Sequence, residues 1–145
     1  MRAVCQRVSR AEVRVGAETT GRIDAGLAIL LGIAHADTAE EADRLAGKIA
    51  RLRIFAGETG KFDRSVLDVA GSALVVSQFT LIADSRKGTR PDFSGAAPRD
   101  VAEPLYSRIC DALQTAGVPV QRGVFGASMQ VELVNDGPVT IVLDT

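Results

Sequence analysis

The Gly137-Pro138 peptide lies between two apolar runs, residues 129–134 and 139–143, that are both typical of strands. Proline fixes its own φ and lacks a backbone N–H, while glycine adopts backbone conformations that other residues avoid. An X-Pro bond is also the only common site of a cis peptide. Such a unit can direct carbonyl oxygens outward, where they would accept hydrogen bonds from an ammonium group. A turn that only connects two strands is the simpler interpretation, and the motif alone favours it.

Size and charge restrict the possible classes of protein. A chain of 145 residues is long enough for one domain, residues 1–145, around one core. Hydrophobic residues make up 46% and charged residues 24%, which is ordinary globular composition and argues against disorder. A net charge of −1 gives no overall attraction to nucleic acid. Any RNA contact must therefore be local.

Cysteine and histidine usage predicts a cytoplasmic protein without a metal site. Cys5 and Cys110 lie far apart in apolar segments, which predicts buried free thiols and a reducing compartment. Charge near the start of the chain, and the lack of any apolar run of about 18 residues, argue against a secretory signal and against membrane contact. His35 is the single histidine and has no neighbouring ligand cluster, so we expect a loop residue and no metal site.

The first third of the chain predicts strands followed by a helix. Short-period patterns indicate strands at residues 3–8, 12–15 and 19–23, with a hairpin at Gly16-Ala17-Glu18, and a buried strand at 27–33. Thr38-Ala39-Glu40-Glu41 has the pattern of a capping box and precedes apolar residues at helical spacing. This pattern predicts an amphipathic helix over 39–51.

The remainder of the chain predicts further strands and a second helix. That helix should run to Ala116 with Gly117 as its stop, and Pro104 implies either a kink or a true start near Pro104 rather than Pro98. A polar loop over 57–61, a glycine- and proline-rich loop over 83–98, and strands at 73–82, 120–125, 129–134 and 139–143 complete the expectation. The pattern indicates an α+β fold, with a largely antiparallel sheet curled into a barrel-like core and two main flanking helices.

Polar residues Ser77, Gln78 and Thr80 interrupt the apolar strand expected over 73–82. An unsatisfied buried hydroxyl or amide costs about 1–3 kcal/mol, so these groups either bond to backbone or line a cavity. Strand alternation would place Gln78 and Thr80 on one face, where Thr80 could act as a nucleophile or position water. No histidine or lysine stands beside Thr80 as a base, which weakens covalent catalysis. Backbone N–H groups at Phe79 or Thr80 could instead stabilise an oxyanion.

Taken together, these motifs resemble the D-aminoacyl-tRNA deacylase family of the bacterial and eukaryotic type. The resemblance rests on Ser77-Gln78-Phe79-Thr80, Asn135-Asp136-Gly137-Pro138-Val139-Thr140, Gln6-Arg7-Val8-Ser9-Arg10-Ala11, Arg53-Ile54-Phe55 and Arg86-Lys87-Gly88-Thr89-Arg90-Pro91, and it covers essentially the whole chain. It implies hydrolysis of the ester that links a D-amino acid to the 3′ end of tRNA, without metal or organic cofactor. Glycine mischarged on alanine tRNA is a second substrate that the resemblance implies.

The resemblance also implies a homodimer with shared active sites. A cis Gly137-Pro138 peptide would enter the partner's site, present its carbonyls to the substrate's α-ammonium and exclude L-aminoacyl groups sterically. Arg7 would hold that peptide, and Ser77, Gln78, Phe79 and Thr80 would form the catalytic wall. The 2′-hydroxyl of the terminal adenosine would assist in activating water.

Three features depart from the family pattern or leave alternatives open. Phe62 and Asp63 stand where the family commonly has methionine and asparagine, and Pro104 is unusual in its helix. Arg86, Lys87 and Arg90 could contact phosphates of the tRNA acceptor end, although a solvated loop is an equal alternative. A threonine-nucleophile hydrolase of another small ester, and a nucleic-acid or partner-binding module, remain the competing functions. Low net charge and 4% aromatic residues argue against general nucleic-acid binding.

Overall fold

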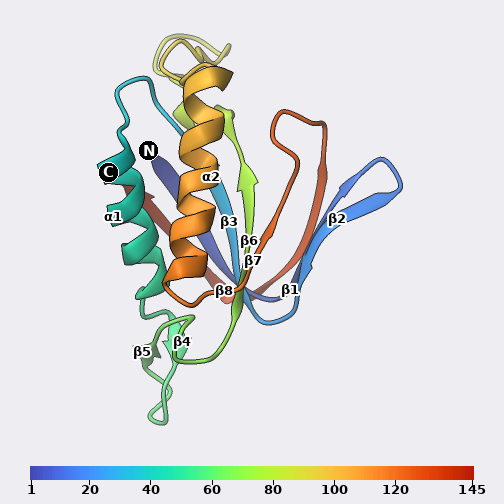
Figure 1. Cartoon of the computed structure of the whole chain (residues 1–145), viewed down its shortest axis with the longest axis vertical. Helices are drawn as coiled ribbons and strands as arrows, with labels where there is room; N and C mark the ends of the chain where they lie inside the picture. The colour runs from blue at the N-terminus through green and yellow to red at the C-terminus, as the bar shows by residue number, and fades with distance from the viewer.

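The computed structural model describes residues 1–145 and contains one main sheet, a small two-stranded sheet and two long helices (Figure 1). In chain order the elements are β1 (Arg2–Val15), β2 (Glu18–Ile23), β3 (Gly26–Gly32), α1 (Ala39–Ala50), β4 (Phe55–Ala56), β5 (Phe62–Arg64), β6 (Ser72–Ser77), the 3-10 turn η1 (Phe79–Ile82), α2 (Arg99–Thr115), β7 (Val120–Arg122) and β8 (Gln130–Asp144).

The long strand β1 organises the main sheet. It pairs antiparallel with β8 along one edge, and with β3 and then β2 along the other. The sheet continues from β3 to β6 and β7 through two parallel pairings. Two separate strands were expected over 3–8 and 12–15, and that prediction is wrong because the chain stays extended through Ser9 and Arg10. The break that was expected between these two strands corresponds only to register shifts in the pairing of β1 with β8.

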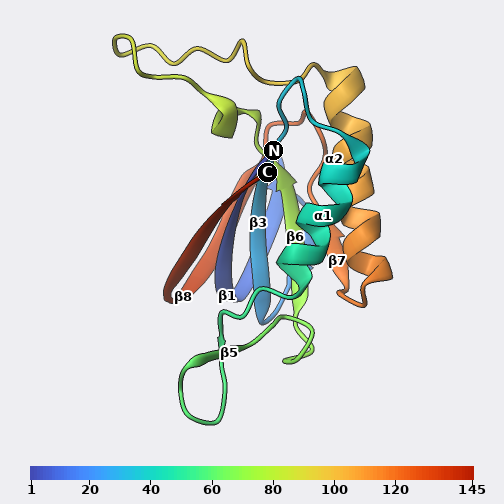
Figure 2. The same cartoon turned by 90° about the vertical axis from the view of Figure 1, so that its left-hand side faces the viewer.

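Both faces of the central strands are buried. Leu27, Ile29 and Leu31 of β3 belong to the larger core, beneath α1 and α2, which cover one face of the sheet (Figure 2). Ala28 belongs to a smaller core on the opposite face, together with Leu74 of β6. Burial on both faces explains why the run over 27–33 is continuously apolar rather than alternating.

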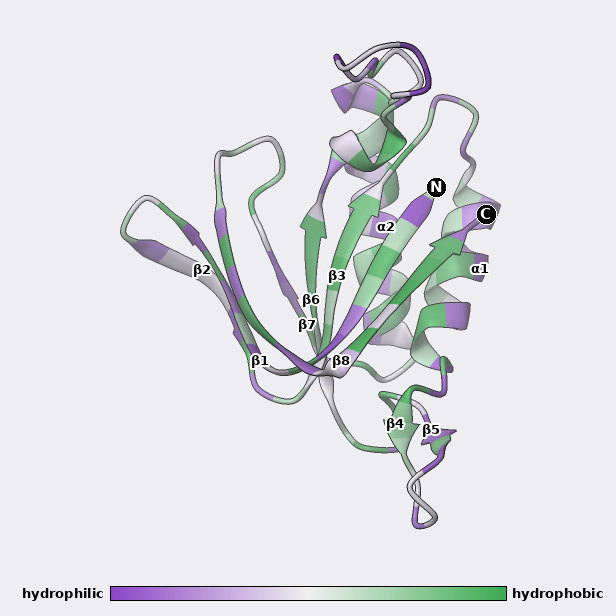
Figure 3. Cartoon of the chain, turned by 180° about the vertical axis from the view of Figure 1, so that it is seen from behind, coloured by the Kyte–Doolittle hydropathy of each residue, from purple (hydrophilic) through white to green (hydrophobic).

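The smaller core exists because the sheet curls over itself. Strands β1 and β8 bend sharply, so that their outer halves and β2 turn back over β6 and β7 (Figure 3). A Cβ on Gly21 of β2 would lie 2.8 Å from the carbonyl oxygen of Arg122 in β7, which shows how closely these strands approach. The predicted α+β fold with a curled, barrel-like sheet and two flanking helices is confirmed.

Both helices follow local sequence rules, with one exception. The predicted capping box at α1 is confirmed, because Thr38 Oγ1 accepts from Glu41 N and the Glu41 carboxylate accepts from Thr38 N. Helix α2 begins at Arg99, so a true start near Pro104 is wrong and Pro104 lies inside the helix. Gly117, with φ +105°, follows the last turn as predicted.

Strand bounds differ from expectation at three places. The strand predicted over 73–82 ends at Ser77, where the chain turns into η1, and the strand predicted over 120–125 ends at Arg122. The runs at 129–134 and 139–143 are not two strands but the single strand β8. Cys5 and Cys110 are buried and free, as predicted. None of the helices combines the length and apolar character required to cross a membrane.

Candidate active site

The Gly137-Pro138 peptide is a bulge inside β8 rather than a turn between two strands. Val8 pairs with Asn135 and Gln6 pairs with Thr140, so the four residues 136–139 stand opposite the single residue Arg7. The interpretation as a strand-connecting turn is therefore wrong. The Gly137-Pro138 bond is cis, and both residues are exposed on the single chain. The bulge projects because both strands continue their pairing on either side of it.

The Arg7 side chain ties this bulge to the body of the protein. Its Nε donates to the Asp136 carbonyl oxygen at 3.0 Å, and its Nη1 donates to the Ile54 carbonyl oxygen at 2.8 Å. The guanidinium also lies 5.6 Å from the ring centre of Phe62 in β5, in cation–π geometry. Only 15% of the Arg7 side chain is exposed. Arg7 is thus a structural anchor and not a solvated strand residue.

The Asn135 side chain and the backbone of Gly137 fix the shape of the bulge. Asn135 Nδ2 donates to the carbonyl oxygens of Arg7 and Val139, each at 3.0 Å, which closes the base of the bulge. Gly137 has φ +138°, and a Cβ there would lie 2.7 Å from Val139 Cγ2 and 2.8 Å from Val139 N. Only glycine fits this position without displacement.

Residues 77–80 form the second part of the candidate site, at the end of β6. The prediction that strand alternation orients them is wrong, because only Ser77 belongs to the strand. Gln78 N still donates to the Leu31 carbonyl oxygen at 2.8 Å, and Gln78 Nε2 donates to Thr80 Oγ1. Thr80 is exposed, and 58% of Phe79 is exposed. Thr80 therefore meets solvent, whereas Ser77 and Gln78 are half-buried.

The backbone at the start of η1 offers N–H groups to a ligand. Two bonds flank the turn, from Leu81 N to the Gln78 carbonyl oxygen at its start and from Ala83 N to the Thr80 carbonyl oxygen at its end. The N–H groups of Phe79 and Thr80 precede the residues that the turn can pair internally. Their donation to an oxyanion stays a prediction.

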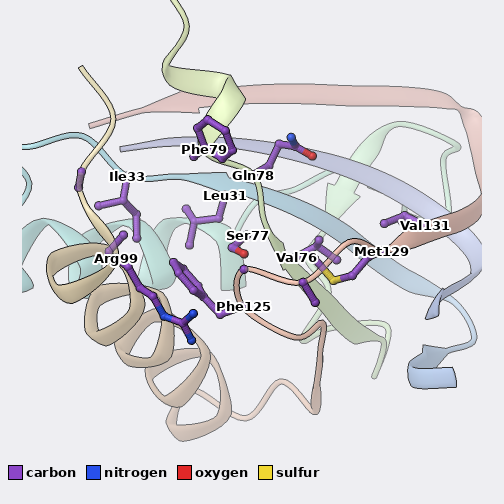
Figure 4. A pocket seen from close by; sticks show the side chains of 14 residues that line it. Leu31, Ile33, Val76, Ser77, Gln78, Phe79, Arg99, Phe125, Met129 and Val131 are labelled. Atoms are coloured by element: carbon purple, nitrogen blue, oxygen red, sulfur yellow. The ribbon is translucent and has the colours of Figure 1, made fainter. Parts of the chain in front are cut away.

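A mostly apolar cavity of about 430 Å³ opens beside residues 77–79 (Figure 4). This volume lies within the usual range of small-molecule pockets, about 300–1,000 Å³. The lining comes from the ends of β3 and β6, the first turns of α2 and the segment between β7 and β8, and comprises Leu31, Ile33, Val76, Ser77, Gln78, Phe79, Ala97, Arg99, Ala102, Phe125, Gly126, Ala127, Met129 and Val131.

Sequence reasoning found only Ser77, Gln78 and Phe79 of this lining. It missed Arg99 and Phe125, whose guanidinium and ring lie 5.7 Å apart. These two residues lie in different elements, and no short motif contains both. Only the topology, which places the start of α2 beside the β7–β8 segment, brings them to the cavity.

The two parts of the site do not meet within one chain. The bulge stands opposite Arg7 of β1. Ser77 pairs with Leu31 of β3, and Leu31 in turn pairs with Ala3 of β1. Four residues separate these two positions of β1 at about 3.3 Å each, and three strand spacings of about 4.8 Å separate β8 from β6, so the two parts are roughly 19 Å apart.

Contacts within the loop and with neighbouring residues shape the basic loop after η1. Arg86 forms an ion pair with Asp84, and this pairing lowers the pKa of the Asp84 carboxyl to about 2. Phe93 contacts Phe79 edge-to-face with ring centres 5.2 Å apart. His35, in a turn as predicted, places Nε2 3.0 Å from the Ser94 carbonyl oxygen. Lys87 and Arg90 are exposed on the same loop.

No group of three or more histidine, cysteine, aspartate or glutamate side chains could hold a metal ion. Burial raises the pKa of the Cys5 thiol to about 12 and that of the Cys110 thiol to about 11. Both thiols belong to the core beneath the helices and not to the cavity lining.

Comparisons of sequence with known proteins agree over the whole chain. A family model described as D-Tyr-tRNA(Tyr) deacylase matches residues 4–144. The D-aminoacyl-tRNA deacylase of Chloroflexus aurantiacus (strain ATCC 29364 / DSM 637 / Y-400-fl) is 58% identical over 145 residues, which cover 100% of this chain and 91% of that protein. The D-aminoacyl-tRNA deacylase of Thermus aquaticus is 57% identical, with coverage of 100% and 95%.

Solved structures share the fold. One, titled c-Myc DNA Unwinding Element Binding Protein, is 44% identical and has a TM-score of 0.94, with coverage of 100% of this chain and 99% of that chain. Another, titled as a structural analysis of a probable eukaryotic D-amino acid tRNA deacylase, is 17% identical and has a TM-score of 0.86, with coverage of 99% and 98%. The second match concerns the fold alone.

Proposed function

Because the chain belongs to the D-Tyr-tRNA(Tyr) deacylase family and is a D-aminoacyl-tRNA deacylase, we propose how its two half-sites perform this hydrolysis. The terminal adenosine of the tRNA occupies the cavity beside residues 77–79. The bulge at residues 136–139 reaches that cavity from a second copy of the chain. The observation that carries this proposal is the glycine-proline bulge, held by Arg7 yet exposed and about 19 Å from the cavity of its own chain.

Adenosine suits the cavity in shape and chemistry. A purine is flat and largely apolar, and the cavity offers the Phe125 ring and aliphatic walls. Ser77 and Gln78 supply polar groups at the end where the ribose hydroxyls would lie. The ester on the 3′ oxygen then stands beside the N–H groups of Phe79 and Thr80.

The bulge supplies the chiral filter. The carbonyls of Asp136 and Val139 are already used by Arg7 and Asn135, which leaves those of Gly137 and Pro138 as acceptors for the substrate's α-ammonium. An amine held by two main-chain oxygens fixes the orientation of the α-carbon. The side chain of a D-residue then points to open space, whereas that of an L-residue meets the backbone of the bulge. Glycine passes this filter, so glycine mischarged on alanine tRNA is a second substrate.

A homodimer with two shared sites follows from the separation of the half-sites. Neither half-site is complete in one chain, and a two-fold axis would place each bulge on the partner's cavity. Strand β8 favours this arrangement, because its outer edge is unpaired and it carries the exposed residues Val134 and Val142.

The reaction is hydrolysis of an ester by water. Water attacks the carbonyl carbon, the bond from that carbon to the 3′ oxygen breaks, and the 3′ oxygen receives a proton. The N–H groups of Phe79 and Thr80 stabilise the oxyanion, and the 2′-hydroxyl of the adenosine assists in activating water, because the chain places no histidine or lysine beside Thr80. The Gln78 amide orients the Thr80 hydroxyl as a positioning group rather than a nucleophile.

Two further assignments complete the proposal. Arg86, Lys87 and Arg90 contact phosphates of the acceptor stem, from a loop attached to the site through Phe93 and Phe79. Two free buried thiols suit the reducing cytoplasm, where aminoacyl-tRNA is found.

Chirality of the substrate tests this function. We expect the purified protein to release D-tyrosine or D-aspartate from charged tRNA and to spare the matching L forms. The Thr80→Ala variant should keep substantial activity because no acyl-enzyme forms. Equal rates on both enantiomers would contradict the filter, and an ester trapped at Thr80 would reverse the assignment of that residue.

One competing function has a specific observation behind it, namely the DNA-binding role in the name of the 44% identical solved structure. A DNA-binding module would rely on the basic loop, since the net charge is only −1. Salt-sensitive binding of duplex DNA without any deacylation of D-aminoacyl-tRNA would favour it.

A further inference from the structure

We propose that Arg99, at the mouth of the cavity, binds the phosphate that joins the terminal adenosine of tRNA to the preceding nucleotide. This inference rests on the proposed occupancy of the cavity by adenosine. It adds a phosphate subsite on α2, separate from the basic loop that contains Arg86, Lys87 and Arg90.

Arg99 is the only charged residue among the 14 that line the cavity. Its side chain is 68% exposed, so the guanidinium stands at the rim and not within the apolar interior. The group lies over the Phe125 ring at 5.7 Å, which holds it beside the wall (Figure 4). A Cβ on Gly126 would lie 3.4 Å from Arg99 Nη1, so the opposite segment also approaches this group closely.

The chemistry of the ligand requires an anion at this rim. An adenosine at the 3′ end of RNA continues in only one direction, through the phosphate on its 5′ carbon. That phosphate cannot enter an apolar cavity without a large desolvation cost, so it must leave at the mouth. A guanidinium there matches a phosphate in geometry and remains charged at every physiological pH.

Glu103 forms an ion pair with the Arg99 guanidinium when no RNA is bound. Its Oε2 accepts from Arg99 Nε at 2.8 Å, one helical turn along α2. Both side chains are exposed, and such pairs are weak because water solvates the separated charges well. A phosphate can therefore displace the Glu103 carboxylate, and the Glu103→Gln variant should bind nucleotide more tightly.

Competition by adenosine and by adenosine 5′-monophosphate tests this subsite directly. Both are used as inhibitors of D-tyrosyl-tRNA hydrolysis by the wild type and by the Arg99→Gln, Arg99→Lys and Glu103→Gln variants. The matched control is Arg44→Gln, which removes the same charge from an exposed position of α1 outside the cavity.

We expect Arg99→Gln to raise the inhibition constant of the monophosphate about two- to fivefold, the range for one exposed ion pair, and to leave that of adenosine unchanged. The slope of log KM for the tRNA against log salt concentration should also fall by about 0.7. This is the value expected when the protein no longer neutralises one phosphate of single-stranded RNA. Arg99→Lys should lie between wild type and Arg99→Gln, Glu103→Gln should tighten the monophosphate, and Arg44→Gln should match wild type.

Equal weakening of both inhibitors would overturn the inference, because Arg99 would then support the cavity wall alone. An unchanged inhibition constant of the monophosphate in Arg99→Gln would overturn the inference as well. So would a change of that constant in Arg44→Gln as large as the change in Arg99→Gln. If neither compound competes although D-tyrosyl-tRNA is hydrolysed selectively, the subsite fails while the deacylase activity and its chiral filter stand.

Discussion

At the scale of single residues, the account depends on Gly137. Its φ is +138°, and a Cβ at this position would stand only 2.7 Å from Val139 Cγ2, so any side chain must displace the bulge. Backbone strain of this kind costs about 1–3 kcal/mol and would move the two carbonyls that we assign to the ammonium.

The Gly137→Ala variant should therefore lose about ten- to a hundredfold in kcat/KM for D-tyrosyl-tRNA, as measured by release of the amino acid. Gly16→Ala is the matched control, since Gly16 also has a positive φ, +59°, but a Cβ there meets nothing within 4 Å. Full activity of Gly137→Ala in a folded protein would argue against a role for the bulge.

Arg7 gives a second residue-scale prediction. A lysine cannot reproduce the planar fork that donates to the carbonyls of Asp136 and Ile54. We expect Arg7→Lys to reduce the ratio of D to L hydrolysis about tenfold, because a loosened bulge excludes L-residues less well. The control Arg10→Lys alters an exposed pair with Glu132 and should leave the ratio unchanged. An unaltered ratio in Arg7→Lys would mean that the bulge holds its shape without this anchor.

At the scale of elements, local rules predicted the helices better than the strands. Thr38 and Glu41 fix the start of α1 within four residues of sequence. In contrast, tertiary contacts set the end of the strand that contains Ser77. The continuity of β8 through Gly137 depends on its pairing with β1, more than 120 residues away. Long-range pairing of this kind leaves no local pattern.

Pro104 gives the element-scale prediction. Inside α2 it cannot donate to the Asp100 carbonyl, yet the helix persists because its buried face includes Tyr106 and Ile109. Replacing Pro104 with alanine should raise the free energy of unfolding by about 2 kcal/mol in urea titrations, with kcat/KM unchanged. Thr38→Ala, which removes the α1 cap, should lower the free energy of unfolding by about 1 kcal/mol. A destabilised Pro104→Ala would show that proline suits this position.

At the scale of the whole molecule, the buried thiols predict how stability depends on pH. In the folded chain the pKa values of Cys5 and Cys110 are about 12 and about 11, against an ordinary value of 9.0. Above pH 9 the unfolded chain releases these protons and the folded chain retains them, so unfolding becomes more favourable as pH rises. Each thiol contributes about 1.4 kcal/mol per pH unit until its folded pKa is reached.

We therefore expect the urea midpoint to fall between pH 9 and pH 11, and the Cys5→Ala/Cys110→Ala variant to show a shallower decline. A slope identical in both proteins would assign the decline to other groups.

The candidate site shows where sequence reasoning stops. Gly137, Pro138, Arg7 and residues 77–80 stand in short motifs, and these motifs were enough to predict them as site residues. Arg99 and Phe125 do not, because the cavity forms only when α2 packs beside the β7–β8 segment. The distance of about 19 Å between the half-sites also required strand register, which only the fold provides.

The central claim is that one chain supplies the bulge and its partner supplies the cavity. Mixing two impaired variants tests this most directly: Gly137→Ala in the bulge, and Ala127→Trp, which fills the cavity. After denaturation and refolding together at equal amounts, half of the dimers should be mixed and should carry one intact site of two. The account predicts recovery of about a quarter of the wild-type rate on D-tyrosyl-tRNA. A mixture no more active than either variant alone would contradict it.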